Sequence, residues 1–390
     1  MLRGAKIVGA TVVFAICASA CTKTSEVAAI DPQPTTGPGH VESSERLFTT
    51  EPSLAKTQAS ITRVVYTSTS GVDGSPTQVS GVVAVPPGAA PEGGWPIVSF
   101  AHGTTGVKPE CGPSVHSDLY GSGGVIATLV ARGYVVAATD YQGLGVGSGH
   151  PYLEPITAAN NVIDAVRAAR TLVPDTRPQW LAYGGSQGGQ AAWAAAEQAP
   201  TYAPELPMVG SVATSPALDL EGLADAAIDG TPSTRQVGVL PLVLTGMTNV
   251  HPDRRIDDYM RNAQQNLAGT LVCAGDGTVE RDTALQKVAP TDFVPATDDA
   301  ARNLRSWLRD TSLPKTETTV PILVLYGGKD DLVLPNWVDT AVNRACGLGD
   351  IIDSRLQPDS THRIDTTPIG DWVADRFAGR PVANTCEAVQ

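Results

Sequence analysis

The sequence QWLAYGGSQGGQ occupies residues Gln179–Gln190. It begins as a short apolar run and ends in a serine with glycines on both sides, and the alanine-rich residues 191–199 follow at once. An apolar run, a glycine-rich turn and a run of helix formers predict a strand, a sharp turn and a helix in that order. Ser186 is expected at the apex of the turn.

Gly184 and Gly188 flank Ser186 at the spacing Gly-x-Ser-x-Gly, which is the nucleophile elbow of α/β-hydrolases. A serine on a strained turn brings the flanking backbone against neighbouring main chain, where residues without a Cβ fit. The following helix directs its free N–H groups at the serine, which suits a developing oxyanion. The same spacing arises by chance in a chain with 39 glycines, but the flanking strand and helix favour a nucleophile.

Strand and helix patterns alternate around this stretch. Strands are predicted at 96–101, 134–140, 208–213, 320–326 and 350–356, helices at 124–132, 156–172, 336–346 and 369–377, and an antiparallel pair at 61–67 and 78–85. This order predicts an α/β fold, the α/β-hydrolase fold, with a mostly parallel sheet and helices on both faces. The core is expected to comprise residues 46–215 and 319–390.

Residues 216–318 interrupt the alternation, because Gly, Asp, Thr and Pro break up their short apolar pieces. We expect a largely helical cap inserted over the site. The alternative is a separate small domain without contact to the site.

The N-terminus resembles an export signal, with Arg3 and Lys6 before an apolar stretch at 7–17. Residues 1–21 are predicted to be the signal peptide, cleaved after Ala20 or processed as a lipoprotein with Cys21 lipidated. The cysteines beyond Cys21 are Cys111, Cys273, Cys346 and Cys386, an even set consistent with two disulfides, so an unmodified Cys21 would be left over. Residues 22–45 are expected to be a flexible tether, and the protein to be a cell-envelope lipoprotein or secreted.

Three residues follow predicted strands in the order Ser186, Asp330, His362, which is the order of the hydrolase triad. His362 would accept the serine proton, and Asp330 would orient the imidazole. Asp331 is the alternative acid, although the spacing Gly327-x-x-Asp330-x-x-Val333 favours Asp330.

The amide of Gln187 and an amide in the loop after the strand at 96–101 are expected to form the oxyanion hole. Thr104 is the preferred loop donor and Thr105 the alternative. The sequence contains no H-E-x-x-H motif, no paired C-x-x-C and no dinucleotide fingerprint, so neither a metal nor a cofactor is predicted. A net charge of -13 without a basic patch argues against a nucleic-acid partner.

The chain resembles the secretory lipase family, which includes fungal lipase A-type enzymes and actinobacterial lipoproteins. The resemblance extends over residues 48–380 and is carried by four motifs: Asp140–Gly145 (DYQGLG), Gly149–Tyr152 (GHPY), Gly184–Gly189 (GGSQGG) and Gly327–Val333 (GGKDDLV). It implies hydrolysis of acyl esters, a cap inserted before the acid-bearing strand, and the disulfides Cys111–Cys273 and Cys346–Cys386. The loop Ala101–Gly106 (AHGTTG) departs from fungal members, which leaves substrate preference open.

The expected function is therefore that of a serine ester hydrolase, a lipase or carboxylesterase working through an acyl-enzyme. Its partners would be an ester substrate and, through the lipid anchor, a membrane. Alternatives are a serine peptidase or acyltransferase on the same scaffold, or a non-catalytic surface-anchored binding protein.

Overall fold

The computed structural model describes residues 36–273 and 278–386. The predicted signal peptide, Cys21 and most of the predicted tether lie outside the described residues. In the part of the chain that is described, no helix combines the length and the apolar character needed to cross a membrane.

A single nine-stranded sheet forms the centre of the fold, in the order β1-β2-β3-β5-β4-β6-β7-β8-β9. Pairing is antiparallel from β1 to β5 and parallel from β5 through β4 to β9. The strands are β1 Val41–Arg46, β2 Ser60–Thr69, β3 Pro76–Val85, β4 Trp95–Ala101, β5 Val135–Thr139, β6 Thr176–Gly185, β7 Met208–Thr214, β8 Ile322–Gly327 and β9 Ile352–Gln357. The predicted mostly parallel sheet and the antiparallel start are confirmed.

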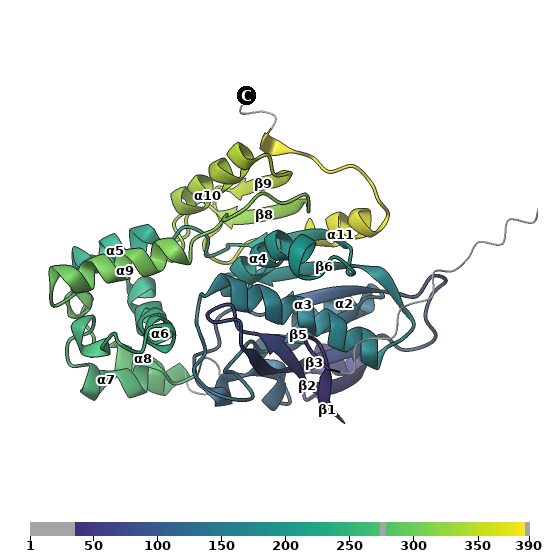
Figure 1. The fold of residues 1–390 in the computed structure, drawn as a ribbon, viewed down its shortest axis with the longest axis horizontal. Coiled ribbons are helices and arrows are strands. Elements are labelled where there is room, and N and C mark those ends of the chain that lie inside the picture. The colour runs from purple at the N-terminus through teal and green to yellow at the C-terminus, as the bar shows by residue number, and fades with distance from the viewer. Residues whose placement is uncertain (1–35, 274–277, 387–390) are drawn as a thin grey trace, which may run out of the picture. The chain divides into compact units, whose positions relative to one another are not determined.

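Helices cover both faces of this sheet (Figure 1). On one face, α2 (Gly123–Ala131) and α11 (Ile369–Phe377) pack with strand residues such as Leu181 and Leu323. On the other face lie α3 (Pro155–Leu172), α4 (Gln187–Tyr202) and α10 (Pro335–Leu348), with strand residues such as Trp180 and Val324. Adjacent strand residues therefore belong to different hydrophobic clusters, as side-chain alternation in a strand requires. A short helix, α1 (Pro52–Lys56), precedes β2.

The flexible tether predicted for residues 22–45 is wrong over its last residues, because β1 begins at Val41 and pairs with β2. The side chains from Glu42 to Arg46 are all exposed, and residues of this exposed, polar kind also make up linkers. The strand forms through main-chain hydrogen bonds to an existing sheet edge. These bonds do not depend on the side chains, so polar side chains do not prevent them.

The described residues between β7 and β8 contain five α-helices, which are grouped together in Figure 1. They are α5 (Glu221–Ile228), α6 (Thr234–Val250), α7 (Ala263–Thr270), α8 (Thr278–Leu285) and α9 (Asp298–Asp310), and we call them the α5–α9 segment. No strand occurs in the described part of residues 216–318. The expected helical character is confirmed, whereas the role of a cap stays a prediction.

The α5–α9 segment is joined to the rest of the fold at several places, among them hydrogen bonds from Asn249 to the His150 carbonyl and from Ser233 to the Asp331 carbonyl. Two further attachments bear on its position. Where it begins and ends, the Leu313 N–H donates to the Leu218 carbonyl at 2.9 Å, so the two ends lie together. The second attachment is the disulfide Cys111–Cys273, which joins the segment to the loop after β4. A further disulfide, Cys346–Cys386, joins α10 to the C-terminal residues. Both pairings are those implied by the family resemblance.

The part of the chain that follows the α5–α9 segment runs alongside α4. The Glu197 carboxylate accepts hydrogen bonds from the Lys315 and Thr316 amides at 2.9 and 3.3 Å. The Thr318 hydroxyl donates to the Ala196 carbonyl at 2.6 Å. These contacts fix the chain before β8 begins, and with it the loop that follows β8.

Candidate active site

Ser186 lies between the last residue of β6 and the first residue of α4, with φ 58° and ψ -119°. A positive φ is strained for a residue that carries a Cβ, and such strain in proteins is concentrated at functional sites. Its N–H donates to the Thr214 carbonyl of β7 at 2.8 Å, which holds the turn in place.

Gly184 and Gly188 allow the turn to form. A Cβ on Gly184 would lie 2.1 Å from the Gly188 carbonyl oxygen, and one on Gly188 would lie 1.9 Å from the Ala101 carbonyl oxygen. Both distances are far inside van der Waals contact, and the atoms involved are backbone atoms that cannot turn aside. Helix α4 therefore packs directly against the end of β4.

We expect Gly188→Ala to lower the free energy of unfolding by about 3 kcal/mol, because the new methyl overpacks a backbone carbonyl. Gly124→Ala is the matched control, since Gly124 is also an early helix residue and a Cβ there meets nothing within 4 Å. The control should leave stability unchanged or raise it by up to about 1 kcal/mol through helix propensity. Urea unfolding of the two variants measures the difference, and equal stabilities would contradict the close packing at the elbow.

Asp330 and His362 are in direct contact. The His362 Nδ1 lies 2.7 Å from the Asp330 Oδ2, and the Asp330 Oδ1 accepts from the Leu332 and Val333 amides at 2.9 and 3.1 Å. The Asp330 residue is only 4% exposed. The two amides and the imidazole fix the position of the carboxylate. The His362 ring is therefore held with its Nε2 facing away from Asp330, and no described residue is hydrogen-bonded to this nitrogen.

Asp331 is placed differently. Its side chain is 59% exposed and lies 3.6 Å from the Arg235 guanidinium. Its carbonyl accepts a hydrogen bond from the Ser233 hydroxyl at 2.7 Å. The structure thus brings Asp330 and not Asp331 to His362.

The residues after β7 connect the serine turn with the His362 loop. The Ser215 hydroxyl donates to the His362 carbonyl at 3.1 Å. Two residues further on, the Ala217 N–H donates to the Ser186 carbonyl at 3.3 Å. Since β6, β7, β8 and β9 are parallel neighbours, the residues after their carboxyl ends lie along one edge of the sheet.

The loop after β4 runs beside the serine turn. A Cβ on Gly103 would lie 3.4 Å from the Gly185 carbonyl oxygen. The neighbouring Thr104 hydroxyl is hydrogen-bonded to the Tyr152 hydroxyl at 2.7 Å, and Thr105 is 6% exposed. Gln187, the first residue of α4, is 2% exposed.

His150 and Tyr152 support these oxyanion candidates, a role the sequence did not indicate. The Gln187 side-chain amide lies 3.0 Å from the His150 Nε2, and the His150 Nδ1 lies 2.8 Å from the Gln142 carbonyl. Burial lowers the pKa of His150 to about 4, so the ring is neutral near pH 7 and donates from Nδ1 while accepting at Nε2. Both residues belong to the motif Gly149–Tyr152, and this motif was the only feature of the sequence that could have pointed to them.

The contribution of His150 to the stability of the protein should fall as the pH is lowered from about 6.5 to about 4. In this range the unfolded chain binds a proton at His150 that the folded protein does not, so unfolding takes up a proton. The contribution is on the order of 3 kcal/mol at most. Urea unfolding at several pH values should show a wild-type stability that falls, relative to that of His150→Gln, as the pH is lowered. His116→Gln, at a partly exposed histidine, should keep the wild-type slope, and identical profiles for all three proteins would contradict this assignment.

Within residues 36–273 and 278–386, no cluster of three or more His, Cys, Asp or Glu side chains is arranged to hold a metal ion.

The model of the family described as "Secretory lipase" matches residues 122–385. A Mycobacterium tuberculosis protein named "Probable inactive lipase" is 26% identical over 344 residues, covering 83% of this chain and 75% of that protein. Lipase 1 of Candida albicans is 24% identical over 336 residues, covering 75% of this chain and 67% of that protein.

Among solved structures, Candida antarctica lipase A in its closed state has a TM-score of 0.72 at 16% identity. The match covers 90% of this chain and 85% of that structure. At this identity the likeness shows the fold alone, and it confirms the predicted α/β-hydrolase fold.

Proposed function

The chain belongs to the secretory lipase family, and we propose that it hydrolyses acyl esters through a triad of Ser186, His362 and Asp330. The family and the α/β-hydrolase fold both support a hydrolase activity. The observation that carries the finer proposal is the 2.7 Å contact between His362 and Asp330 on the edge of the sheet where the strained Ser186 lies.

In the proposed reaction the His362 Nε2 takes the Ser186 proton as the Ser186 Oγ attacks the ester carbonyl. The amides of Gln187 and Thr104, or Thr105 in its place, stabilise the negative oxygen of the tetrahedral intermediate. His362 then gives its proton to the leaving alcohol, and an acyl-enzyme remains. Water attacks this ester by the same steps in reverse order, releasing the acid and restoring Ser186.

The surroundings of the triad support this assignment of roles. The two amides on the Asp330 Oδ1 hold the carboxylate in place, with its Oδ2 aimed at the His362 Nδ1. The neutral His150 holds the Gln187 side chain, which steadies the start of α4. We also propose that the α5–α9 segment caps the site and that Cys21 carries a lipid anchor. The family and the two disulfides are consistent with export.

The proposal is tested by measuring hydrolysis of p-nitrophenyl esters from acetate to palmitate. Activity that falls off with acyl length identifies a carboxylesterase, and activity that rises with it identifies a lipase. A fluorophosphonate probe followed by peptide mass spectrometry should label Ser186. Folded protein that neither hydrolyses any ester nor reacts with the probe would favour the alternative of a non-catalytic binding protein. The mycobacterial relative is itself named a probable inactive lipase. Mass spectrometry of the mature N-terminus tests the anchor at Cys21.

A further inference from the structure

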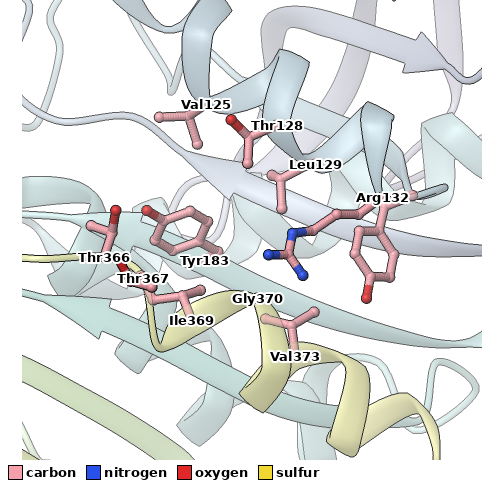
Figure 2. Close-up of a pocket in the computed structure, with 11 residues that line it drawn as sticks. Val125, Thr128, Leu129, Arg132, Tyr183, Thr366, Thr367, Ile369, Gly370 and Val373 are labelled. Carbon is pink, nitrogen blue, oxygen red and sulfur yellow. The ribbon is translucent and has the colours of Figure 1, made fainter.

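The loop after β4, residues 102–106, lies against the start of α4. A Cβ on Gly188 would lie 2.7 Å from the His102 carbonyl oxygen. On the other face of the sheet, Tyr183 lines a cavity of about 340 Å³ between α2 and α11, and none of the loop residues lines that cavity (Figure 2). The loop therefore belongs to the surroundings of the serine turn, whereas the cavity lies apart from it.

The ring of His102, the first residue of the loop, is buried between two main-chain carbonyls. The residue is 3% exposed. Its Nδ1 lies 2.6 Å from the Gly103 carbonyl oxygen, and its Nε2 lies 3.2 Å from the Asp140 carbonyl oxygen. The main chain of the same residue is also held, because the Tyr141 hydroxyl donates to the His102 carbonyl at 2.9 Å. These contacts join the loop to the two residues that follow β5.

The His102 ring has one proton to share between the two carbonyls. Burial lowers the pKa of His102, against the opposing effect of the Asp140 charge, so the imidazole is neutral near pH 7. A neutral imidazole donates from only one of its nitrogens. A nitrogen 2.6 Å from a carbonyl oxygen needs a proton between the two atoms, because their lone pairs would otherwise repel each other. The proton is therefore on Nδ1, and the Gly103 carbonyl accepts it.

This hydrogen bond determines the direction of the next amide. The peptide bond between Gly103 and Thr104 is trans. In a planar trans peptide the C=O and the N–H point in opposite directions. Because the His102 Nδ1 holds the Gly103 oxygen, the Thr104 N–H points away from the buried ring. No described residue accepts a hydrogen bond from this N–H, so it is available to a substrate.

The two threonines of the loop differ in their surroundings. Thr104 is partly exposed, and its hydroxyl is hydrogen-bonded to the Tyr152 hydroxyl at 2.7 Å. Thr105 is buried, and its hydroxyl has no partner among the described residues. Thr104 is thus fixed on two sides, by His102 through the peptide plane and by Tyr152 through its side chain. A substrate reaches the amide of a partly exposed residue more readily than that of a buried one.

We propose that His102 is a positioning residue that directs the Thr104 N–H at the oxyanion, through the hydrogen bond from its Nδ1 to the Gly103 carbonyl. The inference rests on the proposed ester hydrolysis and selects Thr104 over Thr105 as the loop donor. His102 itself does not touch the substrate. Its loss should lower kcat and leave KM nearly unchanged, because the oxyanion exists only in the transition state and the intermediate.

Two substitutions separate the two ring nitrogens. Relative to Cβ, the amide nitrogen of asparagine occupies the place of Nδ1, and that of glutamine occupies the place of Nε2. We expect His102→Gln to lower kcat for p-nitrophenyl esters about a hundredfold, near the effect of losing one oxyanion donor, with KM within about twofold. His102→Asn should keep kcat within about fivefold of the wild type. A role in core packing alone predicts the reverse order, because glutamine is closer to histidine in volume.

Inhibition by an alkyl trifluoromethyl ketone reports on the oxyanion directly, because the Ser186 Oγ adds to the ketone and leaves a negative oxygen. The inhibition constant should rise in His102→Gln in proportion to the loss of kcat. His116→Gln is the matched control. The His116 Nε2 also lies near a carbonyl, that of Glu110 at 2.7 Å, but this contact is outside the loop. The control should keep the kcat and the inhibition of the wild type.

NMR of wild-type protein with isotope-labelled histidine shows which ring nitrogen of His102 carries the proton, and we expect Nδ1. A proton on Nε2 alone would overturn the inference even in an active enzyme. So would a kcat that is equal in the two His102 variants, or lower in His102→Asn than in His102→Gln. Folded wild-type protein that hydrolyses no ester would instead refute the proposed function, and the role of His102 with it. An active wild type with unaffected variants refutes the role of His102 alone.

Discussion

Ser186→Ala is expected to lower kcat for p-nitrophenyl ester hydrolysis by a factor of about 10⁴ or more. The variant lacks the Oγ that forms the proposed acyl-enzyme, and the nearby Ser215 hydroxyl is engaged with the His362 carbonyl at 3.1 Å. Initial rates of the purified wild type and variant, with the acyl length that the wild type prefers, measure the loss.

The strained backbone at this position provides a second readout. Because Ser186 has φ 58°, glycine should adopt the same turn without strain. We expect Ser186→Gly to be as inactive as Ser186→Ala but more stable than it by about 1 kcal/mol. An alanine variant that keeps more than a tenth of the wild-type rate would exclude Ser186 as the nucleophile.

Asp330→Asn is expected to lower kcat by about 10⁴-fold while leaving KM nearly unchanged. An asparagine that still accepts from the Leu332 and Val333 amides must turn its NH₂ group toward the His362 Nδ1. The imidazole then carries its proton on Nε2, the nitrogen that has to accept one from Ser186. Steady-state kinetics across acyl lengths should show the loss with every substrate.

Asp331→Asn is the matched control. It makes the same chemical change one residue away, at a side chain that is 59% exposed and contacts Arg235 instead of His362. Its kcat should stay within about twofold of the wild type, since surface ion pairs contribute little. Similar losses in both variants would contradict the assignment of Asp330 as the acid.

The sheet could be predicted from the sequence because its signals are local. Apolar runs marked most strands of the core, and the glycine spacing around Ser186 is imposed by backbone atoms within a few ångströms. Helix α11 was predicted with the bounds Ile369–Phe377 that the structure has. Strand β1 was missed, because an edge strand with exposed polar side chains carries no hydrophobic pattern.

The parts of the site that depend on contacts between distant segments could not be predicted from the sequence. Nothing in the motif Gly149–Tyr152 indicates that His150 would meet the Gln187 side chain, or that Tyr152 would meet Thr104. The turn spacing favoured Asp330, but Asp331 stayed an alternative for the same reason, because adjacent residues on a loop point in directions that only packing decides. Helix boundaries in the α5–α9 segment were obscured by residues such as Pro241, which lies inside α6.

The disulfide Cys111–Cys273 gives the α5–α9 segment a covalent tie to the loop after β4, beside the weaker contacts that hold it. The ends of the segment lie together at Leu218 and Leu313, the Asn249 side chain donates to the His150 carbonyl, and the Ser233 hydroxyl donates to the Asp331 carbonyl. Single hydrogen bonds of this kind open and re-form, whereas the disulfide persists, so the disulfide bounds how far the segment can move from that loop. In the proposed role of a cap, the segment would be kept near the site by a bond that lasts only where thiols stay oxidised.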